Sequence, residues 1–344
     1  MRIVHLSDIH VWQYSFNPLR LMNKRAVGMF ELLTGRAGRF RLERLRGVVE
    51  RVLGLAPDHV LITGDLTTTA LPDEFRSARA ALADLLVDAR RVTVLPGNHD
   101  RYTTGSVRYR QFEEWFGAFA PPGPYPWLRA LDDQTSILGL DATRSHISAR
   151  GWLPPEQLEG ARGLVADPET RPKRLIVANH YPVAAPPAYA GELAPKRLKN
   201  AQDVGRWLAT LGPHLYCCGH VHAAWAFVPP EIPDELCLNA GAPLLRDPTG
   251  LRPPGFLEIL LKDRDVTVTH HAWAGDEWTE RPMFQAPSLF PAGMERVSIG
   301  VGKAHWLEPP LPPNRTGGSP ASGSPVDGLT SKRVDGPKHG LSPD

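Results

Sequence analysis

Residue types that can act as metal ligands recur in this chain directly after short apolar runs. They are Asp8 and His10 after Ile3–Leu6, Asp65 after Val60–Ile62, Asn98 and His99 after Val92–Leu95, His180 after Leu175–Ala178, and His220 and His222 after Leu215–Cys218. Apolar runs of this length are typical of buried strands. In α/β proteins the carboxyl ends of parallel strands meet at one edge of a sheet, where ligands bind. The pattern therefore predicts that these segments converge on one polar site.

The types of side chain indicate which metals such a site would hold. Carboxylate, imidazole and amide groups together suit Mn²⁺, Fe, Zn²⁺ or Ni²⁺ better than Ca²⁺ or Mg²⁺, which prefer oxygen ligands alone. Side chains at i and i+2 of a strand point the same way, so Asp8 with His10, and His220 with His222, could each face a common centre. Seven ligands are too many for one ion. They fit two ions roughly 3.5–4 Å apart that share one carboxylate, an arrangement used in phosphoryl transfer.

The order of these motifs resembles that of a known family. The chain carries Asp-x-His, Gly-Asp, Gly-Asn-His-Asp, a lone His and Gly-His-x-His, in the order found in the calcineurin-like metallophosphoesterases. The resemblance spans about residues 1–275. It implies an α/β fold of the four-layer αββα sandwich type and a dinuclear metal-dependent hydrolase, for which Mn²⁺ is the expected metal.

The resemblance also implies a role for each residue of the motifs. The implied ligands are Asp8, His10 and His222 for one ion, Asn98, His180 and His220 for the other, and Asp65 as a bridge between them. His99 would donate a proton to the leaving group or bind the phosphoryl oxygens. Asp100 would orient that imidazole, as carboxylates do in other carboxylate–histidine pairs.

Composition agrees with a soluble enzyme that has one large domain. The chain has 344 residues, of which 42% are hydrophobic and 22% charged, enough for a substantial core. We expect no spanning helix, because no stretch of about 18 apolar residues occurs. The first strand leaves no room for a signal peptide, and three cysteines make no disulfide framework. These features predict a cytoplasmic protein. Residues 276–307 are expected to form a strap over the domain, and the Pro/Gly/Ser-rich residues 308–344 a disordered tail.

A basic insertion follows the first motif, at residues 17–40. Asn17-Pro18 is a typical helix start. Apolar side chains then recur at helical spacing, namely Met22, Ala26, Met29, Phe30 and Leu33, among many arginines and lysines. Such a helix is typical of a segment that lies on an anionic membrane surface or grips an anionic amphiphile. The alternative is a helix packed on the core with a solvated basic face. No nucleic-acid-binding motif accompanies the basic residues, so nucleic acid is not an expected partner.

Further motifs resemble one branch of the family, the UDP-2,3-diacylglucosamine pyrophosphatases of the Gly-Asn-His-Asp type, which act in lipid A synthesis. The motifs are Asn17-Pro18-Leu19, Asn23-Lys24-Arg25, Leu95–Asp100 with Tyr102-Thr103, and Asn179–Pro182. This resemblance implies cleavage of a lipid-linked nucleotide diphosphate to UMP and a lipid monophosphate, at the inner face of a cytoplasmic membrane. The side chains expected to bind this substrate are Arg20, Lys24, Arg25, Met29, Phe30, Tyr102 and Tyr109.

Two alternative functions share the metal motifs. One is a class III cyclic-nucleotide phosphodiesterase acting on cyclic AMP or another phosphodiester, a group that often has His-His where this chain has Asn179-His180. The other is a metal-free phosphoesterase fold that serves as a protein-binding scaffold, which would require lost ligands, and none is lost here. The better-known branch of diacylglucosamine pyrophosphatases has Arg where His99 stands, so the chain departs from that branch.

Periodicity predicts the remaining elements. Helices are expected over 41–55, 73–89 and 105–119, and a hairpin over 256–261 and 266–271. Histidines outside the motifs, including His214, His270 and His271, are expected at the surface.

Overall fold

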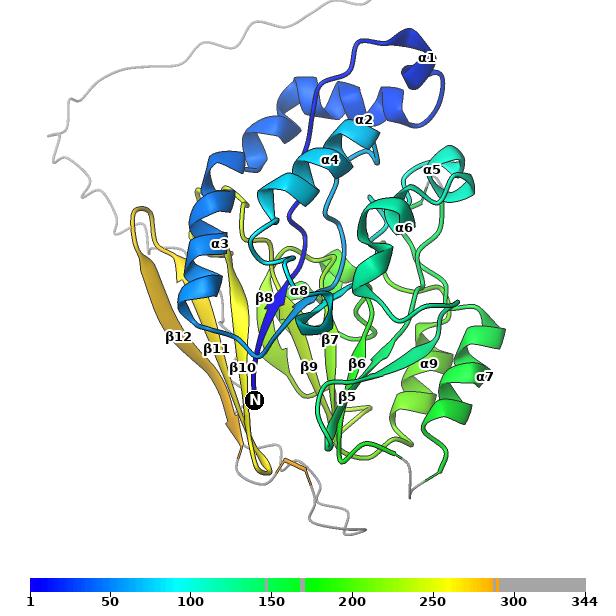
Figure 1. Cartoon of the computed structure of the whole chain (residues 1–344), viewed down its shortest axis with the longest axis vertical. Coiled ribbons are helices and arrows are strands. Elements are labelled where there is room, and N and C mark those ends of the chain that lie inside the picture. Colours follow the sequence, from blue (N-terminus) through cyan, green and yellow to red (C-terminus); the bar gives the residue numbers. More distant parts are fainter. Residues whose placement is uncertain (146–147, 168–170, 287–288, 291–344) are drawn as a thin grey trace, which may run out of the picture. The chain divides into compact units, whose positions relative to one another are not determined.

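Two six-stranded sheets form the centre of the computed structural model, which describes residues 1–145, 148–167, 171–286 and 289–290 (Figure 1). The first sheet contains β1 (Arg2–Leu6), β2 (His59–Ile62), β3 (Val92–Val94), β10 (Gly255–Lys262), β11 (Asp265–Trp273) and β12 (Trp278–Ala286). The second contains β4 (Trp127–Ala130), β5 (Thr135–Gly139), β6 (Arg174–Ala178), β7 (His214–Cys218), β8 (Ala224–Phe227) and β9 (Glu235–Ala240). The strand orders are β12-β11-β10-β1-β2-β3 and β4-β5-β6-β7-β9-β8.

The strands that precede the metal motifs are parallel within each sheet. β1 pairs in parallel with β2 and β2 with β3, and β5, β6, β7 and β9 form a parallel run in the second sheet. The strands of each parallel set therefore end at the same edge of their sheet, as the sequence predicts.

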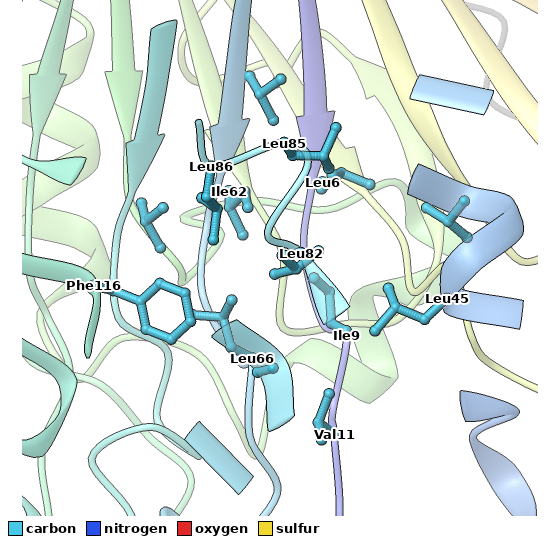
Figure 2. Packing of buried hydrophobic residues seen from close by; sticks show 14 of the residues in the cluster. Leu6, Ile9, Val11, Leu45, Ile62, Leu66, Leu82, Leu85, Leu86 and Phe116 are labelled. Atoms are coloured by element: carbon cyan, nitrogen blue, oxygen red, sulfur yellow. The ribbon is translucent and has the colours of Figure 1, made fainter. Parts of the chain in front are cut away.

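Helices cover the outer face of each sheet. The first sheet is covered by α3 (Leu45–Gly54), α4 (Pro72–Ala81) and α6 (Gln111–Phe116), and the second by α7 (Pro155–Leu164), α8 (Pro187–Leu193) and α9 (Ala201–Leu208). Figure 2 shows part of the first helix–sheet interior, where Leu6 and Ile62 of the sheet lie near Leu45 and Phe116 of the helices.

A third apolar interior lies between the two sheets. Because strand side chains alternate, Val4 and Leu6 of β1 join the helix-covered cluster, whereas Ile3 packs in the cluster that also holds Ile137 and Ile176 of the second sheet. Helix, sheet, sheet and helix thus form four layers. The predicted αββα sandwich is confirmed.

The predicted insertion folds as short helices rather than as one long helix. They are α1 (Pro18–Leu21), α2 (Arg25–Glu31), a π-helical turn at Leu32–Arg36 and a 3-10 turn at Ala37–Arg39. Asn17 caps α1, since its Oδ1 accepts from the Leu19 N–H at 3.0 Å. None of the helices among the described residues is long and apolar enough to cross a bilayer.

The predicted apolar stripe divides between the core and the surface. Met29 is 3% exposed, but Met22, Phe30 and Leu33 are 80%, 66% and 57% exposed. The inner face instead includes Arg25, whose Nε and Nη2 donate to the carbonyls of Thr69 and Ala70 at 3.0 and 2.5 Å. It also includes Gly28, where a Cβ would lie 2.8 Å from Thr69 Cγ2 and 2.9 Å from Tyr102 Oη. The helix therefore docks by a buried arginine and a close backbone approach, and leaves apolar side chains outside.

Other predicted elements differ at their ends. The helix predicted over 73–89 ends at Ala81, and the one predicted over 105–119 is divided into α5 (Thr104–Arg108) and α6 because Arg110 has left-handed backbone, φ 50°. The helix predicted over 41–55 begins as a 3-10 turn at Leu42–Arg44 and continues as α3, and β10 and β11 form the predicted hairpin. Part of the predicted strap, Trp278–Ala286, is strand β12 and pairs with β11. The predicted tail lies outside the described residues.

The prediction that three histidines lie at the surface is wrong. His214, His270 and His271 are fully buried in the sheets. Two of them have carboxylate partners: His214 Nε2 lies 3.3 Å from Glu235 Oε2, and His271 Nε2 lies 2.9 Å from Glu258 Oε2. Such partners offset the cost of burying a polar ring.

Candidate metal centre and active site

The seven predicted ligands lie just beyond the carboxyl ends of β1, β2, β3, β6 and β7. Five of them have left-handed backbone, with φ 53° at Asp8 and His10, 54° at Asp65, 72° at His220 and 40° at His222. This conformation is uncommon for residues other than glycine and clusters at functional sites. Asp8 and His10 share one group of candidate ligands, as predicted, whereas His220 and His222 do not; strand alternation is not the cause, because β1 ends at Leu6 and β7 at Cys218. The turns after the strands, not the strands, direct these side chains.

The ligand atoms gather in two groups. In one, Asp8 Oδ1 lies 3.3 Å from His222 Nε2 and 3.7 Å from His10 Nε2. In the other, His180 Nε2 lies 3.1 Å from Asn98 Oδ1 and 3.2 Å from His220 Nδ1. These are the two sets that the family resemblance implies. His220 and His222 thus face different groups, although they are only two residues apart.

Asp65 lies between the two groups. Its Oδ2 is 3.6 Å from His10 Nε2 and 3.3 Å from His180 Nε2. Its Oδ1 is held by the backbone, since the His99 N–H donates to it at 2.7 Å. Gly97 permits this approach, because a Cβ there would lie 2.1 Å from Asp65 Oδ1. One oxygen is thus fixed, and the other is in a position to bridge two cations.

The donor atoms fit divalent cations. Asp8 Oδ2 accepts from the His220 N–H at 2.9 Å, whereas its buried Oδ1 has no hydrogen-bond partner among the described residues. A buried carboxylate oxygen without a partner is costly unless a cation binds it. His180 Nδ1 donates to the Thr63 carbonyl at 2.8 Å, so Nε2 presents its lone pair to the group. Which atoms bind an ion stays a prediction.

The surrounding charges keep both carboxylates ionised. Burial alone would raise the pKa of Asp65, but the neighbouring His180 imidazole holds it below its usual range. For Asp8 too, burial opposes ionisation, and the nearby imidazoles of His10 and His222 lower its pKa well below the usual value. Ionised carboxylates are the form that metal binding requires.

His99 lies beside the metal groups and contacts a cation that the motifs did not indicate. Its Nδ1 donates to the Thr68 carbonyl at 2.6 Å, so its Nε2 accepts from Arg36 Nη2 at 3.0 Å. The pKa of His99 is well below its usual range, first because the ring is buried and then because Arg36 is near. The Tyr102 ring stacks on the imidazole with centroids 5.5 Å apart. His99 is thus a neutral, firmly positioned group at the edge of the centre.

Asp100 does not contact the His99 ring, contrary to the predicted role. Its Oδ1 accepts from the Thr67 N–H and hydroxyl, both at 2.9 Å, and its Oδ2 accepts from the Gly97 N–H at 2.9 Å. The carboxyl is buried, which raises its pKa to about 6 with a further contribution from Asp65. Asp100 therefore connects the loops that carry Asp65 and His99, and the Thr68 carbonyl orients the imidazole in its place.

A second buried carboxyl, Glu74, holds the loop that presents Thr68. Its Oε2 accepts from the N–H groups of Thr69 and Leu71 at 2.8 and 3.2 Å, and its Oε1 from the Thr69 hydroxyl at 3.0 Å. Burial raises the pKa of Glu74 to about 7.

Replacing Glu74 by Gln should destabilise the protein. An amide offers one acceptor atom where the carboxyl offers two, so at least one buried donor loses its partner, at a cost of about 1–3 kcal/mol. Urea unfolding measures this loss, with the exposed Glu114→Gln as a matched control. Because the folded pKa lies above the unfolded one, Glu74 adds proton-linked stability that is full below the unfolded pKa and declines as pH rises through about 7. The gap between wild type and variant should therefore narrow between pH 5 and pH 8, and a gap that widens would contradict this account.

A cavity of about 990 Å³ opens over the centre. Metal-site residues line it, including Asp65, His99 and His222. One wall comes from the insertion, between Glu31 and Phe40. The remaining lining residues are Ala149, Glu192, Lys196, Leu245, Arg246, Asp247, Pro248 and Arg252. The Phe40 ring packs on His10 and His222, with centroids 4.6 and 5.7 Å apart. The insertion therefore takes part in forming the site.

The predicted substrate-binding side chains lie elsewhere. None of the seven lines this cavity. Lys24 lies over the Tyr102 ring, 4.1 Å from its centroid, and Arg20 pairs with Asp73 at 2.8 Å. Arg25 and Met29 are buried, whereas Phe30 and Tyr109 are 66% and 70% exposed. Their role in binding stays a prediction.

Sequence reasoning missed the basic side chains of the cavity. Arg36 and Arg39 belong to the run that was interpreted as a basic helix face. Lys196, Arg246 and Arg252 lie in no motif, so no local signal identifies them.

Comparisons with known proteins agree with this geometry. The family described as "Calcineurin-like phosphoesterase" matches residues 1–224. Glycerophosphodiester phosphodiesterase GpdQ of Enterobacter lignolyticus (strain SCF1) is 26% identical over 186 residues, 53% of this chain and 57% of that protein, so the match spans little more than half of the relative. A dimetal phosphatase from Danio rerio superposes with a TM-score of 0.55 at 14% identity, over 79% of this chain and 96% of that one. Purple acid phosphatase PPD1 from yellow lupin seeds gives 0.51 at 13% identity, over 81% and 52%. The two structural likenesses show the fold.

Proposed function

The chain belongs to the calcineurin-like phosphoesterase family and is a metal-dependent phosphoester hydrolase, and from this premise we propose that it cleaves a phosphodiester or diphosphate bond of an amphiphilic substrate. The observation that carries the proposed chemistry is the pair of ligand groups on either side of Asp65 Oδ2. Mn²⁺ is the proposed metal, and Fe, Zn²⁺ and Ni²⁺ suit the same donors.

Residues of the chain have distinct parts in this reaction. Two divalent cations, when bound by the seven ligands, supply Lewis-acid activation of water and neutralise phosphoryl charge. Arg36, anchored by Glu31 at 2.8 Å, points its other guanidinium nitrogen at His99 Nε2 and lines the cavity. A phosphoryl or leaving oxygen entering there would meet both groups, and a guanidinium binds such oxygens strongly. In the free site His99 Nε2 accepts from Arg36 and carries no proton, so it would take up a proton when an anionic substrate binds Arg36 and would then give that proton to the leaving oxygen.

The insertion supports an amphiphilic substrate. Seven of the thirteen exposed large apolar side chains among the described residues lie within residues 14–33: Tyr14, Phe16, Leu19, Met22, Val27, Phe30 and Leu33. We call this set the apolar surface. Exposed apolar side chains gathered in one segment mark sites of binding to lipid or protein. The insertion supplies five of these side chains and a wall of the cavity, so acyl chains and phosphate could be bound from one segment.

We therefore propose UDP-2,3-diacylglucosamine as the substrate, cleaved to UMP and a lipid monophosphate at the cytoplasmic face of a membrane. Basic residues of the insertion, such as Arg20 and Lys24, would lie at the level of anionic headgroups. A smaller phosphodiester is the second candidate, favoured by the match to a glycerophosphodiester phosphodiesterase. Cyclic AMP belongs to the same class of small diesters.

Replacing Met22 and Phe30 by Asp together should separate these candidates. Each loses the free energy of burying a large apolar side chain in lipid, about 1.5–3 kcal/mol, so kcat/KM for UDP-2,3-diacylglucosamine in mixed micelles should fall roughly a hundredfold or more. The fraction of the protein that sediments with anionic phospholipid vesicles should fall as well. Hydrolysis of bis(p-nitrophenyl) phosphate with Mn²⁺ should stay within about twofold, because neither residue lines the cavity.

The matched control is Val87→Asp with Leu53→Asp, two exposed apolar side chains outside the insertion. It should leave all three measurements unchanged. Equal loss of lipid and aryl diester hydrolysis in the Met22/Phe30 variant would make the insertion a purely structural element. Faster wild-type turnover of cyclic AMP or a glycerophosphodiester than of the lipid would replace the lipid substrate by the second candidate.

A further inference from the structure

We propose that Arg39 and Arg246 form a second anion-binding subsite in the cavity, one that takes a phosphate group other than the phosphate being hydrolysed. The inference rests on the proposed function and narrows its substrate class to molecules with two phosphates. The subsite joins the insertion to the loop after β9, two segments about which the metal motifs say nothing.

Backbone pairing places the two arginines opposite one another. Phe40 and Leu245 form an antiparallel bridge, in which the Arg246 N–H donates to the Arg39 carbonyl at 2.6 Å and the Arg41 N–H donates to the Leu244 carbonyl at 2.8 Å. Residues that lie opposite in an antiparallel pair carry their side chains on the same side, about 4.5–5.5 Å apart at Cβ. The two arginine side chains therefore start from neighbouring backbone positions on the same side of the bridge.

These arginines are also the cavity's unpaired cations. Arg36 pairs with Glu31 at 2.8 Å, and Glu192 binds both Lys196, at 2.9 Å, and Arg252. Asp247, the remaining acid on the wall, accepts from the Thr249 N–H at 3.0 Å and from the Arg252 N–H. Within the described ranges, neither Arg39 nor Arg246 has an ion pair, and both are exposed. Like charges placed opposite each other repel, and an anion between them removes that cost.

The two arginines flank Phe40 and Leu245 in the lining of the cavity. Phe40 packs against His10 and His222. Arg39 precedes Phe40 in the chain, Arg246 lies on the other side of the bridge, and both line the same cavity. A volume of about 990 Å³ is that of a pocket for a whole organic ligand rather than for one phosphate group. A substrate held at both places would extend past Phe40.

The second phosphate could be adjacent to the scissile one, as in a diphosphate, or remote, as in a nucleoside bisphosphate. Three substrates separate these sources. The p-nitrophenyl ester of thymidine 5′-phosphate has one phosphate, its 3′-phosphorylated form has a remote second phosphate, and UDP-glucose has an adjacent one.

The double variant Arg39→Gln, Arg246→Gln should lower kcat/KM at least roughly tenfold for one or both two-phosphate substrates, since each lost bond to a charged group costs about that much. The loss should appear mainly in KM, because the subsite is away from the reacting atoms. The one-phosphate ester should change by less than about twofold. Arg108→Gln with Arg110→Gln removes the same charge outside the cavity and should affect none of the three.

The results distinguish failure of the subsite from failure of the proposed function. Equal effects on one- and two-phosphate substrates would overturn the subsite while leaving the hydrolase intact. Absence of wild-type hydrolysis of all three substrates and of UDP-2,3-diacylglucosamine with Mn²⁺ would instead overturn the proposed function. If the double variant fails to fold by circular dichroism, Arg246→Gln alone carries the test, because its backbone keeps the bridge, and its KM for the two-phosphate substrates must still rise.

Discussion

Replacing Asp65 by Ala should reduce hydrolysis to the background rate. Asp65 Oδ2 lies within 3.6 Å of His10 Nε2 and 3.3 Å of His180 Nε2, so both groups of ligands lose an oxygen at once. The substitution also frees the His99 N–H that Asp65 Oδ1 accepts at 2.7 Å, which loosens the proposed proton donor. We expect the purified variant to hold one metal ion or none, measured by elemental analysis alongside kcat with Mn²⁺.

The exposed Asp84→Ala is the control for Asp65→Ala, and it should keep both metal content and turnover. An Asp65→Ala enzyme that turned over at the wild-type rate would refute the two-metal mechanism. A variant that kept both ions but lost activity would show that Asp65 positions the reacting groups without bridging.

Replacing His99 by Ala should slow the reaction roughly 10²–10⁴-fold while metal content stays near normal, which is the range for loss of a general acid. The His99 backbone N–H, which holds Asp65, is kept in this variant. The loss should shrink for p-nitrophenol, a good leaving group that needs little protonation, and reach its full size for an alkyl alcohol. A series of diesters with leaving groups of graded pKa measures this slope.

An equal loss for good and poor leaving groups would contradict proton donation by His99. In that case its task would be to place Arg36, whose Nη2 lies 3.0 Å from His99 Nε2, against the phosphoryl oxygens. Arg36→Ala should then lose as much activity as His99→Ala, and the double variant little more than either single one.

The sequence predicted the fold and the metal groups because their signals are local. Each ligand directly follows a short apolar strand, and strand, turn and ligand are adjacent in the chain. The family resemblance then supplied the division into Asp8, His10 and His222 against Asn98, His180 and His220. What it did not supply was the backbone conformation that turns these side chains inward, since left-handed φ at residues such as Asp8 depends on tertiary contacts.

The basic side chains that line the cavity could not be predicted from the sequence, for a different reason. Arg36 contacts His99, which lies 63 residues further along the chain, and the backbone of Arg246 contacts that of Arg39 at an even larger sequence separation. Nothing in the local pattern distinguishes these arginines from the others in the basic run. Periodicity also left open which side of the α2 segment faces the core, because it does not reveal that Arg25 binds two carbonyls inside.

The division of the predicted ligands between the two sheets would couple metal affinity to folding. Asp8, His10, Asp65 and Asn98 follow strands of the first sheet, and His180, His220 and His222 follow strands of the second. Neither sheet alone holds a complete coordination shell for both ions, so the unfolded chain and any half-assembled form bind them weakly. By thermodynamic linkage, ions at a hundred times their Kd add about 2.7 kcal/mol per site to the native state alone. Cations held by these residues would thus link the two sheets, and we expect chelation to lower the stability of the whole domain as well as its activity.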